Sequence, residues 1–491
     1  MPPIITKSKF MSGLQCSKLL WSLYNAREQF AELDARTSAI LDQGNEVTAM
    51  ARSLFPNGID ARSGGLDFSA VVGCTKNLLQ GPLPIFEASI SYKDAFASAD
   101  ILEPADLHSW NILEVKSSTS VKEVHLNDLA FQWFVYAGAG LNIAKAFILH
   151  INNEFVKRGA INPQELFTRV DVTEQVTALL PQISQQVSSM HRTISAAQCP
   201  EIIVGDHCSN PYQCPLTDRC WAFLPAHNVF TLVRGGEKKT TLFNQGVLDI
   251  KDIPEDFGLS SKQSIQRIST ITGTPYVEPT SIAAFLQGLI YPLYFLDFET
   301  FSNAIPLYDG VKPYQQVPFQ FSLHILRNET AEPEHYMFLA DGVEDPRPSF
   351  LRRLKEVLGE TGSIVTYNAA FEKARLRECC SEMGGLEQWL EGISNRIVDL
   401  LVPFRAFHFY HPEQKGSASM KAVLPALTGK NYSHLEIQDG GSASSQFLES
   451  LGMAPDDPER ARIRRALEEY CTLDTSGMID ILNALKRLTT R

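Results

Sequence analysis

The chain has 491 residues, 44% of them hydrophobic and 20% charged, with a formal net charge of −12. This composition is that of a globular protein, and the length suggests about two to four domains. The acidic balance excludes a chain coated in basic residues, but it leaves room for a local basic groove that binds nucleic acid.

The N-terminus predicts neither a secretion signal nor a membrane anchor. The segment MPPIITKSKFMSGLQCSKLLW has no long apolar stretch and no small-residue cleavage site. No apolar run approaches the roughly 20 residues that cross a bilayer. We therefore expect a cytoplasmic protein without membrane association. Disulfide bonds are rare in that compartment, so the spacing of the nine cysteines matters more than their number.

A predicted hairpin carries the first candidate site. In SADILEPADLHSWNILEVKSST, Asp100 begins one apolar run, and Glu114 and Lys116 lie inside the next. Strand alternation puts Glu114 and Lys116 on one face, opposite Leu113 and Val115. Two carboxylates can share Mg²⁺, and the lysine can orient or deprotonate a metal-bound water or stabilise charge on a phosphate. An E-x-K triplet taken alone is more often part of an ordinary hairpin with a surface salt bridge.

Two helical segments add to this hairpin. Gln132 and Tyr136 are four residues apart in NDLAFQWFVYAGAGL, so they lie on one helix face. Upstream, the helical pattern DQGNEVTAMARSLFP carries Glu46, a further candidate metal ligand.

Four cysteines form a second candidate set. Cys208, Cys214 and Cys220 are six apart in HCSNPYQCPLTDRCW, a composition that favours a coil. Cys16 is the distant fourth member. Four thiolates suit a [4Fe–4S] cluster or Zn²⁺, and unrelated free thiols are the alternative. We expect the remaining cysteines to be packing residues: Cys74, Cys199, Cys379, Cys380 and Cys471.

Residues 1–225 resemble an iron–sulphur nuclease domain. The motif residues Asp100, Glu114-x-Lys116 and Gln132-x-x-x-Tyr136 resemble the PD-(D/E)xK core of RecB-like nucleases. The cysteines resemble those of iron–sulphur versions in helicase–nuclease subunits and CRISPR-adaptation exonucleases, where the cluster ties the first helix to the C-terminal coil. Relatives often carry His in the first helix. This chain has Glu46 there, which the resemblance assigns as a metal ligand.

Residues 226–288 are more polar and more basic than their surroundings. Short helices separated by Gly and Pro are predicted. The stretch FNQGVLDIKDIP faintly resembles a helix–hairpin–helix, an element that binds nucleic-acid backbones. A plain helical linker is the favoured interpretation.

A third region begins with a strand that carries two carboxylates, YFLDFETF. Asp297 and Glu299 project from one face, and like charges this close repel unless a cation lies between them. A strand end in solvent is the other interpretation. Further carboxylates follow: Glu372 in the helix of TYNAAFEKARL, and Asp474 one helical turn after Tyr470 in EEYCTLDTSGMIDIL. A tyrosine so placed can orient an attacking water.

This series resembles the Tyr-containing subclass of the DEDD exonucleases, which have an RNase H-like α/β fold. The resemblance makes Asp297, Glu299, Glu372 and Asp474 ligands of Mg²⁺ or Mn²⁺, with Tyr470 beside them. Most of the superfamily has Asp where this chain has Glu372. Asp399 is either an extra ligand or a strand-end residue.

Several polar and aromatic residues suit a substrate channel. They are Lys312, Tyr314, Gln316, Lys415, Ser417, Lys421, His408, Tyr410 and His411.

The whole chain resembles a bacterial family that fuses an iron–sulphur RecB-like nuclease to an RNase H-like domain. The phrases FLDFET, PYQQVPFQFSLH, TYNAAFEKARL and YCTLDT are those of its C-terminal domain. We expect an α/β protein with a PD-(D/E)xK restriction-endonuclease-like domain (1–225), a small helical linker (226–288) and an RNase H-like domain (289–491).

The resemblance implies a metal-dependent nuclease that acts on DNA, single-stranded or at ends, in repair or defence. Two alternatives stay open. One is an RNA exonuclease, since the DEDD fold handles both polymers. The other is a nucleic-acid-binding protein in which only one site cuts.

Overall fold

The structure is a computed structural model that describes residues 3–31, 35–62 and 68–489. It divides into two units. Unit 1 comprises Met1–Ala222 and Asn303–Gln315, and unit 2 comprises Phe223–Ser302 and Gln316–Arg491. Both units combine helices with a mixed sheet, so the predicted α/β class is confirmed. Residues 226–288, expected as a separate linker, belong to unit 2.

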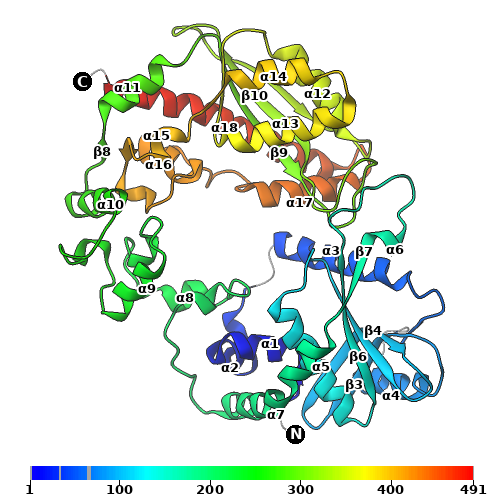
Figure 1. Ribbon diagram of the computed structural model, residues 1–491. Helices are drawn as coiled ribbons and strands as arrows, with labels where there is room; N and C mark the ends of the chain where they lie inside the picture. Colours follow the sequence, from blue (N-terminus) through cyan, green and yellow to red (C-terminus); the bar gives the residue numbers. More distant parts are fainter. Residues whose placement is uncertain (1–2, 32–34, 63–67, 490–491) are drawn as a thin grey trace. The chain divides into compact units, whose positions relative to one another are not determined.

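Unit 1 is built on a seven-stranded sheet (Figure 1). The strand order is β2-β3-β4-β5-β6-β7, and β1 pairs in parallel with β4. Strands β3, β4 and β5 form an antiparallel meander, whereas β5 and β6 are parallel. The strands are β1 (Ile5–Thr6), β2 (Ile59–Asp60), β3 (Ile85–Tyr92), β4 (Ala95–Pro104), β5 (Trp110–Lys116), β6 (Ile143–Ile151) and β7 (Phe167–Asp171).

Helices cover both faces of this sheet. On one face α5 packs against β3 and β4, and α1 and α7 pack on α5. On the other face α3 packs against β5. The helices are α1 (Lys7–Gln15), α2 (Ser17–Asn25), α3 (Ala35–Arg52), α4 (Phe68–Leu78), α5 (Glu123–Gly138), α6 (Pro163–Leu166), α7 (Thr173–Ser195) and α8 (Thr217–Trp221).

The two hydrophobic cores of unit 1 follow the alternation of β5. Ile112 lies in the core beneath α5, whereas Leu113 and Val115 lie in the core beneath α3. The prediction that Leu113 and Val115 face away from Glu114 is therefore confirmed.

The segment 303–315 is part of unit 1. Tyr314 donates a hydrogen bond to the Ser117 carbonyl, and Asp309 pairs with Lys157 at 2.8 Å. Lys312 pairs with Glu154 at 3.1 Å. Lys312 and Tyr314, predicted for a substrate channel of the third region, thus make their contacts within unit 1.

Unit 2 has a five-stranded sheet with β9 at its centre. The order is β11-β10-β9-β12-β13, antiparallel from β11 to β9 and parallel from β9 to β13. The strands are β9 (Leu293–Phe301), β10 (Val317–Leu326), β11 (Glu334–Leu339), β12 (Ser363–Thr366) and β13 (Ile397–Asp399). A separate pair joins β8 (Tyr276–Val277) and β14 (Phe409–Tyr410).

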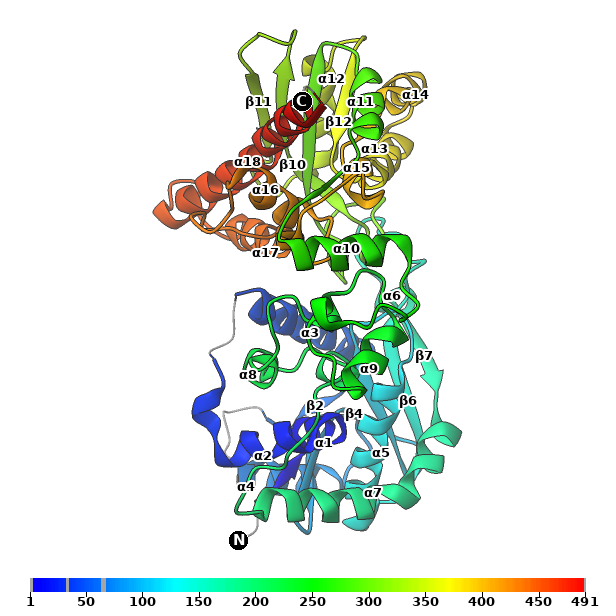
Figure 2. The same ribbon diagram turned by 90° about the vertical axis from the view of Figure 1, so that its left-hand side faces the viewer.

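Helices also cover both faces of the unit 2 sheet (Figure 2). One face, with Tyr294, Leu296 and Phe298, packs on α12 and α13. On the other face α18 runs along β9 and β10, with α16 and α17 beside it. These helices are α12 (Pro346–Val357), α13 (Ala369–Met383), α14 (Glu387–Arg396), α15 (Val402–Arg405), α16 (Met420–Thr428), α17 (Gly440–Leu451) and α18 (Pro458–Thr489).

Residues 226–288 form short helices with a small core of their own. Leu242, Ile250 and Ile253 are buried in it. The helices are α9 (Glu237–Asn244), α10 (Ser261–Thr272) and α11 (Pro279–Gln287). Within the described ranges, no helix combines the length and apolar character that a membrane crossing requires.

Phe10 is expected to be a major contributor to the stability of unit 1. It is fully buried on α1, and its ring stacks on Phe131 of α5 with centroids 4.5 Å apart. Truncating it leaves a cavity, so Phe10→Ala should lower the free energy of unfolding by about 3–5 kcal/mol. Urea denaturation followed by circular dichroism measures this loss.

Leu107→Ala is the matched control. Leu107 is 90% exposed, so its truncation should change stability by no more than about 0.5 kcal/mol. Equal effects of the two substitutions would contradict the packing role of Phe10.

Candidate functional site

The predicted carboxylates of unit 1 come together on the α5 face of the sheet. Lys116 donates to Glu114 Oε1 and to Asp128 Oδ2, both at 2.7 Å. Gln132 Nε2 donates to Glu114 Oε2 at 2.7 Å and to Asp128 Oδ1 at 3.0 Å. Asp100 Oδ2 accepts a hydrogen bond from the Val115 amide at 2.7 Å. We call these residues, together with Lys7, the unit 1 carboxylate site.

Two members of this site were missed by the sequence reasoning. Lys7 donates to Glu114 Oε1 at 2.6 Å, although it lies 107 residues earlier in the chain. Asp128 precedes Gln132 by four residues, so helical spacing could have revealed it. No local signal pointed to Lys7, because only the pairing of β1 with β4 brings it to the site.

The pKa values of Asp100 and Glu114 in the unit 1 carboxylate site are shifted in opposite directions. Burial and the charge of Glu114 raise the pKa of Asp100 to about 7, although Lys7 and Lys116 oppose the rise. Burial also disfavours ionised Glu114, but the charges of Lys116 and Lys7 outweigh it and lower the pKa of Glu114. Glu114 is therefore held as a carboxylate by two ammonium groups.

Tyr136 and Glu46 lie apart from this network. The Tyr136 hydroxyl donates to the Ala88 carbonyl and accepts from the Ala99 amide at 3.0 Å. It therefore positions β4, the strand that carries Asp100, and corrects the expectation of a catalytic Tyr136. Glu46 is exposed on α3, and it is not among the leading charges that act on Asp100 or Glu114. Its role as a ligand stays a prediction.

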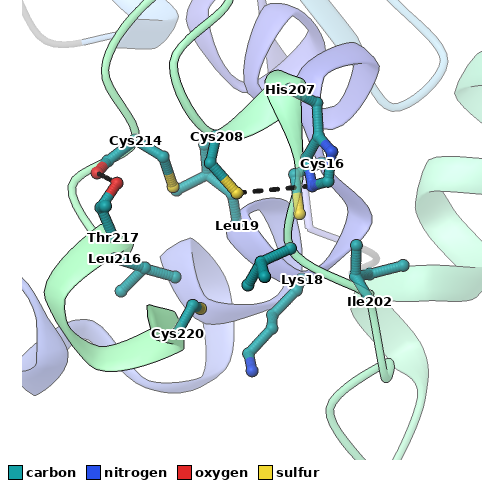
Figure 3. A pocket seen from close by; sticks show the side chains of 11 residues that line it. Cys16, Lys18, Leu19, Ile202, His207, Cys208, Cys214, Leu216, Thr217 and Cys220 are labelled. Atoms are coloured by element: carbon teal, nitrogen blue, oxygen red, sulfur yellow. Dashed lines mark hydrogen bonds between the residues drawn. The ribbon is translucent and has the colours of Figure 1, made fainter. Parts of the chain in front are cut away.

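The four predicted cysteines line one pocket (Figure 3). Cys16 lies between α1 and α2, Cys208 and Cys214 lie in the segment before α8, and Cys220 lies in α8. We call Cys16, Cys208, Cys214 and Cys220 the cysteine site. The Cys214 amide donates to the Cys208 carbonyl at 2.8 Å, which folds this coil back on itself.

Two contacts and one electrostatic effect characterise the cysteine site. Gln15 Nε2 donates to the carbonyls of His207 and Tyr212, at 2.8 and 2.7 Å, and so ties α1 to the cysteine coil. Burial raises the pKa of the Cys214 thiol, and the charges of the other three cysteines raise it further. Thiolates gathered in this way are stabilised by a cationic centre.

The predicted carboxylates of unit 2 also gather, at the centre of β9. Asp297 and Glu299 face α18, and α18 supplies Tyr470 and Asp474. Glu372 comes from the first turn of α13, after Asn368 turns the chain in a left-handed conformation with φ of 85°. We call Asp297, Glu299, Glu372 and Asp474 the unit 2 carboxylate site.

Like charges and burial act on each member of the unit 2 carboxylate site. Burial raises the pKa of Asp297 well above its ordinary value, and Asp474, Glu299 and Glu372 raise it further. Burial and Asp474 do the same for the pKa of Glu299, against the opposing charge of Lys421.

The carboxyl groups of Glu372 and Asp474 also have raised pKa values. Burial raises the pKa of Glu372 to about 8, and its Oε2 atom is buried without a hydrogen-bond partner among the described residues. Burial also raises the pKa of Asp474 to about 6. An unpartnered carboxylate oxygen beside other carboxylates fits a divalent cation, which prefers hard oxygen ligands.

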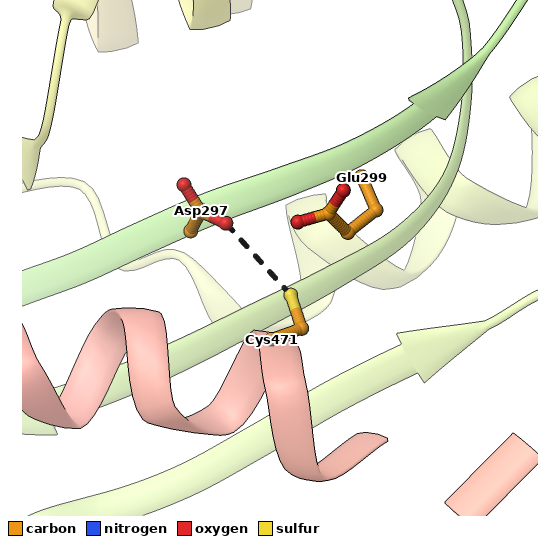
Figure 4. A group of neighbouring side chains, drawn as sticks. All are labelled: Asp297, Glu299 and Cys471. Atoms are coloured by element: carbon orange, nitrogen blue, oxygen red, sulfur yellow. Dashed lines mark hydrogen bonds between the residues drawn. The ribbon is translucent and has the colours of Figure 1, made fainter. Parts of the chain in front are cut away.

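Three further residues approach the unit 2 carboxylate site. Cys471 Sγ donates to Asp297 Oδ2 at 3.9 Å, and one ligand atom each of Asp297, Glu299 and Cys471 lie within 4.8 Å of one another (Figure 4). Cys471 was expected only to pack. Tyr432 donates to Asp474 Oδ1 at 2.5 Å, and Lys421 Nζ lies 5.5 Å from the centroid of the Tyr470 ring. Tyr432 was missed because it lies 42 residues before Asp474.

Other candidates of unit 2 have structural contacts. Asp399 Oδ1 accepts from the amides of Asn368 and Leu401 at 2.9 and 3.0 Å, so this carboxylate holds the turn before α13. Tyr410, predicted to stack on bases, is 1% exposed and stacks on Phe407. The structure thus corrects the expectation for Tyr410.

Comparison with known proteins gives similarities whose names carry no activity. Residues 294–419 match the family described as "Domain of unknown function (DUF2779)". The chain is 26% identical over 206 residues to "Uncharacterized protein MG366 homolog" of Mycoplasma pneumoniae. It is 24% identical over 207 residues to "Uncharacterized protein MG366" of Mycoplasma genitalium. Each match covers 38% of this chain and 31% of the relative, so the chain spans about a third of their length.

The family match covers only part of the unit 2 carboxylate site. It contains Asp297, Glu299 and Glu372 but ends before Tyr470 and Asp474. The chemistry of both units is therefore inferred from their geometry.

Without divalent metal, unit 2 should lose stability as the pH rises. The folded-state pKa values of about 8 for Glu372 and about 6 for Asp474 exceed the ordinary values of about 4 in an unfolded chain. The folded state therefore binds more protons in this window. This contribution to stability is full below about pH 4 and is lost as the pH rises to about 8. Thermal unfolding in EDTA across this window measures the trend.

Glu372→Gln tests the assignment, because the amide is neutral at every pH. At pH 8 in EDTA it should raise the free energy of unfolding by roughly 1–4 kcal/mol and flatten the pH dependence. Glu391→Gln, at an exposed position of α14, should leave both unchanged. A Glu372 variant that behaves like the control would contradict the burial of an unpaired carboxylate.

Proposed function

We propose that the chain is a metal-dependent nuclease with two active sites that hydrolyses phosphodiester bonds of DNA, single-stranded or at ends. The single observation that carries this proposal is the convergence of Asp297, Glu299, Glu372 and Asp474 from β9, α13 and α18. Buried like charges of this kind are costly unless cations offset them. The resemblance of both halves to nuclease families supports the same reading.

In unit 2, hard oxygen ligands for Mg²⁺ or Mn²⁺ would come from the unit 2 carboxylate site. When bound, such ions activate water and stabilise the leaving oxygen in phosphodiester hydrolysis. Tyr470, whose side chain hydrogen-bonds Asp474, would orient the attacking water. Lys421, exposed above the rings of Tyr432 and Tyr470, would contact a phosphate of the substrate.

In unit 1, Asp100 and Glu114 would hold the divalent cation. The Oε1 atom of Gln132 is buried there without a partner among the described residues, which leaves an acceptor for a bound ion or its water. Lys116 would stabilise negative charge on the phosphate, since its own charge is retained by Asp128 and Glu114.

The cysteine site would hold a [4Fe–4S] cluster, with Zn²⁺ as the alternative. Tetrahedral Zn²⁺ with Zn–S distances of about 2.3 Å brings its sulphur ligands to about 3.8 Å from one another. Among the described residues, the cysteine sulphurs do not form a group of three within 4.8 Å. A cluster spaces its thiolates more widely, because each thiolate binds a different iron; the resemblance to iron–sulphur nucleases is what favours the cluster here.

Location, pathway and substrate belong to the same proposal. We place the enzyme in the cytoplasm, in DNA repair or in defence, because two sites that hydrolyse DNA would serve either process. DNA is favoured over RNA because unit 1 resembles DNA nucleases, and the assay below compares both polymers.

Substitution of one carboxylate in each unit should separate the two activities. End-labelled single-stranded DNA and matched RNA are incubated with full-length protein and Mn²⁺. Glu114→Gln should lower the rate of cleavage by unit 1 about 100-fold or more. Asp474→Asn should lower the rate of cleavage by unit 2 to the same extent. The double variant and EDTA should remove both.

Glu123→Gln and Glu449→Gln, at exposed positions of α5 and α17, are the matched controls and should cut normally. Loss of all cleavage in one single variant, with no change in the other, would identify a nucleic-acid-binding protein with one active site. Preferred cleavage of RNA would identify the RNA exonuclease. Undiminished cleavage by the double variant would contradict the proposal.

Protein purified without oxygen should contain the cluster. We expect about four iron and four sulphide ions per chain and the broad visible absorption of iron–sulphur charge transfer. Cys214→Ser should lower the iron content severalfold, whereas Cys199→Ser, outside the cysteine site, should not. Colourless protein with one zinc ion per chain would favour the alternative.

A further inference from the structure

Lys7 is the one member of the unit 1 carboxylate site to which the proposed mechanism gives no task. It is the first residue of α1, and its ammonium lies 2.6 Å from Glu114 Oε1 and 3.8 Å from Asp128 Oδ2. The same Glu114 oxygen accepts a hydrogen bond from Lys116. Two cations of different origin thus meet on one carboxylate.

The fold holds Lys7 in this position from both sides. Before it, Ile5 and Thr6 pair with Ala95 and Phe96 of β4. After it, Phe10 stacks on the ring of Phe131 in α5. Because these contacts are buried, the start of α1 is fixed relative to the strand that carries Asp100.

The two lysines differ in what their ammonium groups have left to offer. An ammonium has three donors. Lys116 uses two of them on Glu114 and Asp128, while Lys7 donates one hydrogen bond among the described residues. The Lys7 side chain is also the more exposed, at 29% against 21% for Lys116. Lys7 therefore has donors to spare, and part of its side chain is open to solvent.

The charge balance of the site indicates a role for Lys7. Asp100, Glu114 and Asp128 carry three negative charges when ionised, against two positive charges from the lysines. A polyanionic substrate approaches such a site more readily where a cation meets it first. Lysine is a point charge that binds phosphate oxygens without needing a fixed orientation.

We propose that Lys7 binds a backbone phosphate of the nucleic acid that occupies the unit 1 carboxylate site. This inference rests on the proposed nuclease function and adds to it a substrate-binding residue from the N-terminal helix. Lys7 holds Glu114 with one donor and takes a phosphate oxygen with another. It contributes one phosphate contact. Loss of this contact lowers the affinity for nucleic acid equally for every sequence.

Salt dependence of binding tests the contact directly. Full-length protein binds a fluorescent single-stranded oligonucleotide in Ca²⁺ at NaCl concentrations from about 50 to 200 mM. Fluorescence anisotropy gives Kd at each salt concentration, and a gel verifies that the oligonucleotide stays intact. Lys7→Ala should raise Kd about 3- to 10-fold, and the slope of log Kd against log salt should fall by about 0.7, the value for one contact with a single strand.

Lys9→Ala is the matched control, since Lys9 lies on the same helix and its ammonium sits 5.3 Å from the centroid of the Tyr24 ring. It should change neither Kd nor slope. Lys7→Arg keeps the charge and should keep the slope. Thermal unfolding of each variant separates a loss of contact from a loss of fold.

An unchanged slope in a folded Lys7→Ala variant would overturn this inference and leave the proposed function standing. If the wild-type protein bound the oligonucleotide without any dependence on salt, both would fall. The Glu114→Gln cleavage assay distinguishes the two cases, because it measures hydrolysis and not the salt dependence of binding.

Discussion

Repulsion among buried carboxylates is the constraint on which unit 2 depends. Asp297 and Glu299 lie on the central strand of the sheet, and α18 brings Asp474 against them. Burial raises the pKa values of Asp297 and Glu299, and the charge of Asp474 raises both further. A fold that needed these positions only for stability would be better served by apolar side chains. Their presence is the reason for proposing a site that is completed by divalent cations.

Unit 1 meets the same electrostatic difficulty in a different way. Lys7 and Lys116 lie directly on Glu114, and they lower its pKa although burial would raise it. Only Asp100 keeps a raised value, of about 7. The charges of Lys7 and Lys116 thus largely offset those of the unit 1 carboxylates, whereas in unit 2 the charge of Lys421 opposes the raised pKa values of Glu299 and Asp474. The two sites should therefore differ in how strongly their stability depends on divalent metal.

The first helix connects two sites of unit 1. Lys7 at its start contacts Glu114, and Cys16 directly follows its last residue. Gln15 ties the same end to the coil that carries Cys208 and Cys214. Displacement of α1 would therefore disturb both the cysteine site and the carboxylate site. This arrangement would let the proposed cofactor act on the proposed active site from a distance, by holding α1 in place.

Local sequence determined much of this protein. The alternation of β5 placed Glu114 and Lys116 opposite Leu113 and Val115, because strand geometry fixes which side chains share a face. The D-x-E strand followed from a pattern of the same short range, whereas the α/β class was expected from the family resemblance. Helical spacing would equally have found Asp128, four residues before Gln132.

Only the tertiary structure decided what depends on contacts between distant segments. Lys7 reaches Glu114 because β1 pairs with β4, and Tyr432 reaches Asp474 across 42 residues. Tyr136 fitted a catalytic motif, yet its hydroxyl is used by backbone groups of β3 and β4. Segment 303–315 joins unit 1, although the strands on either side of it belong to unit 2. The spacing of residues in the sequence predicts which neighbouring side chains share a face of a helix or strand. It does not predict these contacts, because they form when distant segments pack together.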